Sequence, residues 1–160
     1  MLTKTFITTL LKAVKEVAII EKSVRQADQI AYGREEREEI EEITPAYIAK
    51  VLWKEEKEEE LQRLNKDFYA RCATLIKKME HEIASRSSFS HSKNLVLIKS
   101  NLLDLIKYRT QKIIKLAMVS HFPQDDLINR MTWEEELLYI ILCKILSSWD
   151  QFIVNEIVGR

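Results

Sequence analysis

Glycine and proline are scarce in this chain, which has only 2 of each among its 160 residues. Tight hairpins and the loops that cradle phosphates depend on these residues, so their scarcity argues against a β-sheet. It also argues against a nucleotide site, because no GxxxxGK[ST], GxGxxG or GxSxG motif is present. We therefore expect neither a sheet protein nor a nucleotide-dependent enzyme.

An excess of charge of one sign is also lacking, since 25 basic and 25 acidic side chains give a formal net charge of +0. The overall balance demands neither nucleic acid nor an anionic membrane as a partner. The histidines His81, His91 and His121 are scattered, and none stands in an HExxH or Glu-x-x-His pattern. We expect no metal site, no cofactor and no catalytic residue.

The two cysteines, Cys72 and Cys143, each sit in an apolar helical pattern without CxxC spacing. This favours buried thiols in a reducing compartment, with a disulfide as the alternative. Charged residues interrupt the apolar opening of the chain, and no run approaches the ~18 apolar residues of a membrane span. The prediction is a cytoplasmic protein without a membrane segment.

Hydrophobic residues make up 46% of the chain and charged residues 31%, a balance typical of amphipathic helices. Apolar residues recur at three- and four-residue intervals along most of its length. We predict an all-α fold, a bundle of about five helices. Residues 1–44 are expected to form an N-terminal helix, to about Ala27, followed by an acidic linker, and residues 45–160 to form the main helical domain.

Local signals place several helix ends. Thr44 followed by Pro45 predicts an N-cap with proline in the first helical position. The serine-rich residues 85–92 lack periodicity and predict a flexible connection. Thr132 with Glu135 predicts a capping box at the start of the last helix.

The longest apolar stripe runs from Leu95 to a helix end near Ser120, and its only gap is Arg109. An arginine in register with a core stripe either extends to solvent from the edge of the core or pairs with a carboxylate across a helix interface. Lys107, Lys112 and Lys115 lie near it. They predict a solvated face or contacts with an acidic partner, and DNA is the alternative.

The last helix is apolar over more than one stripe, which a helix wetted on one side does not need. We predict that part of it is buried against another chain. Large aromatic residues such as Trp53 and Trp149 are interface candidates, although the position of Trp149 in mid-stripe favours the core.

Two blocks of sequence carry a family resemblance. The first is VLWKEEKEEELQRLNKDFYARCATLIKKME, from Val51 to Glu80. The second runs through LIKYRTQKIIKLAM to MTWEEELLYIILCKIL, ending at Leu146. From Ala46 onward the chain resembles the helical domain of archaeal GINS subunits, of the type in which that domain comes first. The family's tyrosine-arginine-lysine-isoleucine pattern is similar to Tyr108, Arg109, Lys112 and Ile113.

The resemblance implies a non-catalytic scaffold in DNA replication. GINS is a tetramer of related subunits, here expected to be of two kinds, that joins the MCM helicase to a Cdc45/RecJ-like protein at the replication fork. The family's small β domain has no counterpart before Arg160, and residues 1–44 have no counterpart in the family. The expected subunit-interface residues are Trp53, Phe68, Tyr69, Tyr108, Arg109, Ile113, Leu138, Ile141, Leu142, Ile145, Trp149 and Phe152.

Two other functions stay open. A self-contained helical bundle could bind nucleic acid through the face from Lys107 to Lys115, and its binding would weaken steeply with salt. A small helical enzyme could use clustered glutamates, but no apolar pocket is evident that would raise the pKa of a carboxylate.

Overall fold

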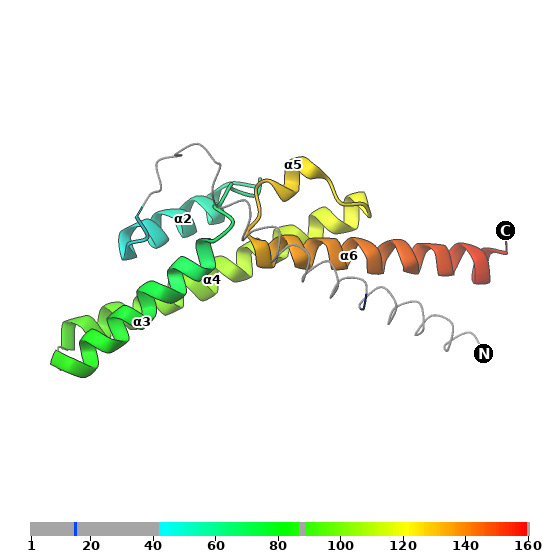
Figure 1. The fold of residues 1–160 in the computed structure, drawn as a ribbon. Helices are drawn as coiled ribbons and strands as arrows, with labels where there is room; N and C mark the ends of the chain where they lie inside the picture. Colours follow the sequence, from blue (N-terminus) through cyan, green and yellow to red (C-terminus); the bar gives the residue numbers. More distant parts are fainter. Residues whose placement is uncertain (1–14, 16–41, 87–88, 160) are drawn as a thin grey trace, which may run out of the picture. The chain divides into compact units, whose positions relative to one another are not determined.

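The structure, a computed structural model, describes Lys15 and residues 42–86 and 89–159. In chain order its elements are α2 (Pro45–Lys57), α3 (Phe68–Arg86), α4 (Phe89–Ser120), α5 (Asp125–Ile128), α6 (Trp133–Phe152) and the π-helical segment η1 (Ile153–Val158) (Figure 1). No strand occurs in these residues. The predicted all-α fold of about five helices is confirmed. The helix predicted before Ala27 lies outside the described residues, as does nearly all of the predicted segment 1–44.

The helix starts that the sequence marks are correct. The Oγ1 atom of Thr44 accepts a hydrogen bond from the backbone N–H of Tyr47 at 3.1 Å, and Pro45 opens α2. At the start of α6, the Thr132 N–H donates to Oε2 of Glu135 at 3.1 Å, and the Glu135 N–H donates back to Oγ1 of Thr132 at 3.4 Å. Both caps satisfy N–H groups that have no partner inside the helix.

The predicted connection at residues 85–92 does lie between two helices, but it is shorter than the sequence indicates. Helix α3 continues to Arg86 and α4 begins at Phe89, so the serine-rich segment is helical except at residues 87–88, which are not described. Serine has a weak preference against helix interiors, and helical residues on either side outweigh it here. The short helix α5 lies between α4 and α6, and it begins with Asp125 and Asp126, which suit the positive end of a helix dipole.

The chain divides into two compact units. Unit 2 holds residues 41–113 and 125–135, and unit 1 holds residues 1–40, 114–124 and 136–160. The division falls inside α4, between Ile113 and Ile114, and inside α6, between Glu135 and Glu136.

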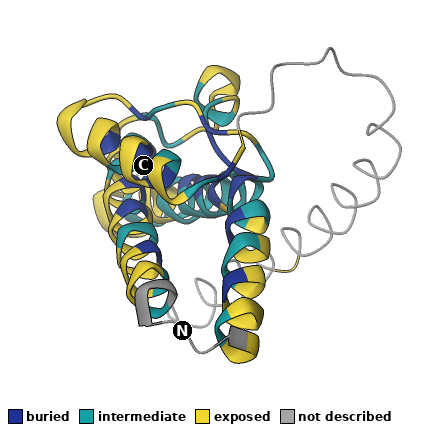
Figure 2. Ribbon diagram, turned by 90° about the vertical axis from the view of Figure 1, so that its left-hand side faces the viewer, coloured by how far each residue is buried: buried dark blue, intermediate teal, exposed yellow. Residues whose placement is uncertain are grey.

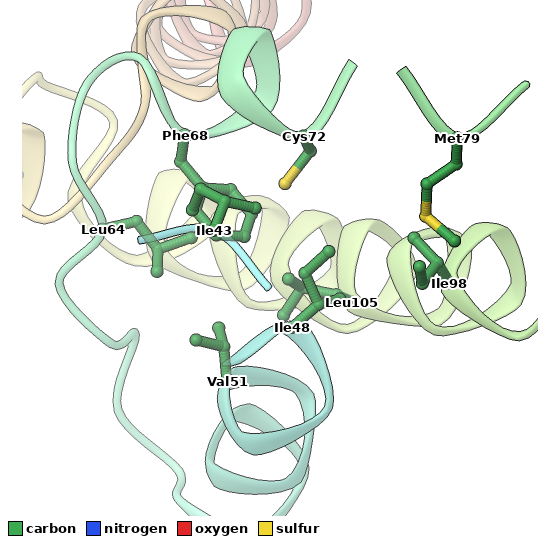
Figure 3. Close-up of a cluster of buried hydrophobic side chains, with 9 residues drawn as sticks. All are labelled: Ile43, Ile48, Val51, Leu64, Phe68, Cys72, Met79, Ile98 and Leu105. Carbon is green, nitrogen blue, oxygen red and sulfur yellow. The ribbon is translucent and has the colours of Figure 1, made fainter. Parts of the chain in front are cut away.

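The core of unit 2 is built from one face each of α2, α3 and α4. Figure 3 shows its side chains converging, with Met79 of α3 against Ile98 of α4. Figure 2 shows buried and exposed residues alternating along the helices, as amphipathic helices require. The buried cluster is Ile43, Ile48, Val51, Leu64, Phe68, Cys72, Met79, Ile98 and Leu105. Ile106, next to Leu105 in α4, is exposed.

In unit 1, the described residues are Lys15, the end of α4 with its following loop, and most of α6 with η1. Tyr139 and Cys143 are its buried α6 side chains, and the Tyr139 hydroxyl lies 3.1 Å from Oγ of Ser120. His121, the residue directly after α4, has a backbone in the left-handed region (φ 54). Its Nδ1 atom lies 2.5 Å from Oδ2 of Asp150. Cys72 and Cys143 are both free and buried, as predicted.

Leu105 and Leu103 offer a matched pair for measuring the unit 2 core. Leu105 is fully buried, whereas Leu103 is 67% exposed on the same helix. Leu105→Ala should lower the free energy of unfolding by about 2–5 kcal/mol, because it removes core contacts and leaves a cavity. Leu103→Ala should change it by about 0.5 kcal/mol or less. Urea unfolding followed by circular dichroism measures both, and equal losses would contradict this assignment of the core.

Candidate functional site

A fully buried arginine lies at the centre of unit 2. Arg109 of α4 donates from Nε to Oε1 of Glu135 at 2.7 Å and from Nη2 to Oε2 of the same carboxylate at 2.8 Å. Its Nη1 donates to Oε2 of Glu55 at 2.7 Å. Two backbone carbonyls accept the remaining bonds, that of Gln62 at 2.8 Å and that of Arg130 at 3.1 Å. These bonds engage every N–H of the guanidinium.

Glu135 joins this arginine to the start of α6. It is 6% exposed and accepts four hydrogen bonds in all. Besides the two from Arg109, one comes from the capping-box N–H of Thr132, and one comes from the Tyr69 hydroxyl at 2.6 Å. One carboxylate therefore caps a helix, neutralises a buried cation and holds a tyrosine of α3.

Glu55 and Lys112 tie α2 to α4 in the same way. Glu55 is fully buried, and its Oε1 accepts from Nζ of Lys112 at 2.7 Å. That ammonium also donates to the carbonyls of Glu55 and Glu58, each at 2.7 Å, and of Glu60 at 3.0 Å. Carbonyls at a helix C-terminus lack partners within the helix and attract a cation, so Lys112 caps the end of α2 from α4.

The buried charges balance, with two cations against two carboxylates. Burial alone lowers the pKa of the Arg109 guanidinium, but the hydrogen bonds and charge of Glu135, with the charge of Glu55, raise it above its ordinary value. Burial, followed by the charge of Glu135, raises the pKa of the Tyr69 hydroxyl far above its usual range. Both groups therefore stay protonated and remain donors. Among the described residues, no buried side-chain nitrogen or oxygen lacks a hydrogen-bond partner.

This network joins side chains of α2, α3, α4 and α6. The Glu135 carboxylate accepts four hydrogen bonds and that of Glu55 accepts three, and an arginine does not exchange its proton at ordinary pH. In the described part of the chain, no group of three or more His, Cys, Asp or Glu residues is placed to hold a metal. We call Glu55, Tyr69, Arg109, Lys112 and Glu135 the Arg109 network.

Several predicted interface residues lie inside unit 2. Phe68, Arg109 and Ile113 are at most 1% exposed, so their side chains contact this chain rather than offering a surface to another. For Arg109 the structure selects the paired alternative over extension to solvent. Lys112 is engaged by Glu55, whereas Lys107 and Lys115 are exposed on α4. With Arg109 buried and Lys112 engaged, the predicted basic face from Lys107 to Lys115 loses two of its four cations.

Other predicted residues do reach the surface. Trp53 is 60% exposed on α2 and Tyr108 is 37% exposed on α4. Trp149, favoured for the core, is 47% exposed, and its ring lies 5.9 Å from that of Phe152. The remaining α6 residues of the prediction are half-buried: Leu138, Ile141, Leu142, Ile145 and Phe152.

Glu55 is the network residue that the sequence did not reveal. It lies in the charged run KEEKEEE, where a solvated face is the ordinary expectation. One signal was available, because Ile48, Val51 and Glu55 are spaced by three and four residues and so share a helix face. A carboxylate in register with buried residues, like an arginine in such a register, needs a charged partner.

Unit 1 exposes several large apolar side chains. Its described residues at 114–124 and 136–159 include few charges, namely Lys115, Glu136, Lys144, Asp150 and Glu156. We call the following exposed side chains the unit 1 apolar surface: Ile114, Met118, Val119, Phe122, Trp149, Val154, Ile157 and Val158. Val119 is the most exposed of them, at 87%.

By length and composition alone, one helix in the described residues, Trp133–Val158, could cross a membrane. An 18-residue window of this helix has a mean hydropathy of 1.6, and 11% of that window is buried. This differs from the prediction of no such segment, which counted uninterrupted apolar residues. Lys144 and Asp150 interrupt the run, but they are too few to offset the surrounding leucines and isoleucines.

Comparisons with protein-family models, with curated proteins and with solved structures find no match for this chain. The resemblance to GINS subunits therefore rests on the residues of the chain itself.

The Arg109 network predicts an asymmetric response to mutation. Arg109→Met should lower the free energy of unfolding by about 3–5 kcal/mol, because it leaves Glu55 and Glu135 buried without their shared cation. The exposed Lys107, on the same helix, is the control, and Lys107→Met should cost about 0.5 kcal/mol or less. Chemical unfolding of both variants measures the difference. A cost for Arg109→Met as small as that of the control would mean that the network contributes no stability.

Proposed function

We propose that this chain is a non-catalytic subunit that holds other proteins in an assembly, of the kind that GINS subunits form. The observation that carries the proposal is the unit 1 apolar surface. Monomeric proteins rarely expose contiguous apolar patches of more than a few hundred Å², and larger ones mark contact sites. The helix beneath this surface is apolar around its circumference, which is typical of a helix buried on several sides.

The arrangement of α6 supports a protein as the covering partner. Tyr139 and Cys143 are buried on one side of the helix, while Ile141 and Ile145, on the opposite side by helical spacing, are half-buried. A second chain packed on α6 would also bury the side that carries Ile141 and Ile145. The predicted interface residues of α6 stay predictions under this proposal.

A membrane is the less favourable partner. Lys144 lies near the middle of the apolar stretch, where a charge in a bilayer costs about 2.5–3.5 kcal/mol even on insertion-based scales, and Asp150 adds a second charge to the stretch. Asp150 is paired with His121 in unit 1. A protein interface can accommodate such a pair at its edge more readily than lipid can.

The Arg109 network supports the GINS form of the proposal. The sequence blocks that carry the resemblance each supply members of it: Glu55 and Tyr69 come from the first block, and Arg109, Lys112 and Glu135 from the second. Similar residues in a related subunit would have the same positioning task. On this proposal the chain joins other GINS subunits in a tetramer that braces the MCM helicase and a Cdc45/RecJ-like protein in the cytoplasm.

Nucleic-acid binding through Lys107, Lys112 and Lys115 is the less favoured function. The Lys112 ammonium is held by Glu55 and three carbonyls. Two exposed lysines are a small electrostatic footprint, since each phosphate contact contributes separately to affinity.

Native mass tests the assembly role. Sedimentation velocity should show an oligomer whose mass is unchanged between low and high salt, because apolar contacts do not weaken with ionic strength. Trp149→Glu should weaken self-association, or association with partner subunits, by about tenfold or more, because it places a carboxylate in an apolar contact. Leu103→Glu, which places the same charge at an exposed apolar residue of α4 in unit 2, should leave the mass unchanged.

Two results would contradict the proposal. One is a chain that stays monomeric at high concentration and ignores GINS, MCM and RecJ-like proteins. The other is partition of the chain into lipid vesicles in place of assembly, which would assign the apolar helix to a membrane.

A further inference from the structure

The outer face of α2 combines one large exposed aromatic ring with three cations. Lys50, Trp53, Lys54 and Lys57 are spaced by three and four residues, so a turn of 100° per residue brings them to one side of the helix. All are exposed, Trp53 by 60%. Ile48, Val51 and Glu55 point the other way, into unit 2. We call these four residues the Trp53 face.

The fold holds α2 firmly from its inner side. Thr44 caps its first turn, and Lys112 binds the carbonyls at its last. Glu55 is locked by Arg109 and Lys112 between those ends. The Trp53 face is therefore presented on a rigid helix, and a rigid site loses less conformational entropy when it binds a ligand.

The fold itself gains little from this face. None of the ion pairs between described residues includes Lys50, Lys54 or Lys57. Like charges three and four residues apart on a helix repel each other and slightly destabilise it. Trp53 is 60% exposed, so most of its surface stays in contact with water. A ligand with negative charge and an apolar side chain would remove both disadvantages.

The chemistry of the face selects the ligand. Ammonium groups bind carboxylates through charge-assisted hydrogen bonds, and an indole ring contacts apolar or aromatic side chains. Nucleic acid fits less well, because the exposed Glu56 and Glu58 follow Trp53 and Lys54 by three and four residues and so lie beside the face. A polyphosphate carries charge at every link and would place phosphates against these carboxylates, whereas a peptide can place uncharged residues there.

We propose that the Trp53 face docks a short segment of a partner protein in which acidic residues alternate with apolar ones. Its carboxylates pair with Lys50, Lys54 and Lys57, and one apolar side chain packs on Trp53. This docking does not depend on the assembly role proposed above, because no residue of the unit 1 apolar surface takes part.

Fluorescence anisotropy of the full chain tests the proposal. The probe is a short fluorescein-labelled peptide that alternates glutamate with leucine and phenylalanine, measured at low salt. It should bind, and the same peptide with glutamine in place of every glutamate should not. Trp53→Ala, and separately the double variant Lys50→Gln with Lys54→Gln, should each weaken binding by about tenfold or more. Lys107→Gln, which removes an exposed lysine from α4, should leave binding unchanged.

Three results would overturn the proposal. The first is no binding of the acidic peptide at low salt. The second is equal binding by the wild-type chain and both Trp53-face variants, with circular dichroism showing that all three are folded. The third is an oligothymidylate of similar length that binds more tightly than the peptide and displaces it, which would assign the face to single-stranded nucleic acid.

Discussion

A fully buried arginine constrains the rest of unit 2. An isolated charge in a protein interior is costly, so Arg109 requires carboxylates and carbonyls at fixed positions around it. Glu55 and Glu135 supply the carboxylates, and Gln62 and Arg130 the carbonyls. These groups come from α2, the link after it, the loop before α6 and the first turn of α6. Any other arrangement of these segments would leave a charge without its partner.

Such a network specifies a structure more than it strengthens one. Replacing a buried ion pair with well-packed apolar side chains is often neutral or stabilising, whereas removing one partner is strongly destabilising. The apolar cluster around Leu105 and Phe68 supplies the burial that favours folding. The network then selects which helix faces meet, and it fixes α2 so that its outer side is presented to solvent.

The sequence predicted the helices well because amphipathic periodicity and caps are local signals. Thr44 with Pro45 and Thr132 with Glu135 marked two helix starts correctly. Glu55 was missed, because its role depends on an arginine far along the chain, and a run of glutamates conceals it. Trp149 was placed in the core from its register, but a stripe does not tell whether the surface that covers it belongs to the same chain.

Both proposed contact sites are surfaces that the fold leaves exposed to solvent. The unit 1 apolar surface and the Trp53 face differ in chemistry, the first being nearly free of charge and the second carrying three lysines around one ring. Neither contributes to the core of its own unit. Two surfaces of different chemistry suit a protein that contacts more than one partner, and a rigid α2 suits a scaffold better than a mobile segment would.

The coupling energy between Arg109 and Glu135 tests the central claim most directly. A double-mutant cycle with Arg109→Met and Glu135→Gln should give a coupling energy of about 2 kcal/mol or more. This is in the upper part of the range of about 0.5–3 kcal/mol that residues sharing one network show. Lys99 and Glu80, whose charged atoms are also 2.7 Å apart but whose side chains are each 47% exposed, should give about 1 kcal/mol or less in the same cycle. Equal coupling energies for the buried and the exposed pair would contradict the account.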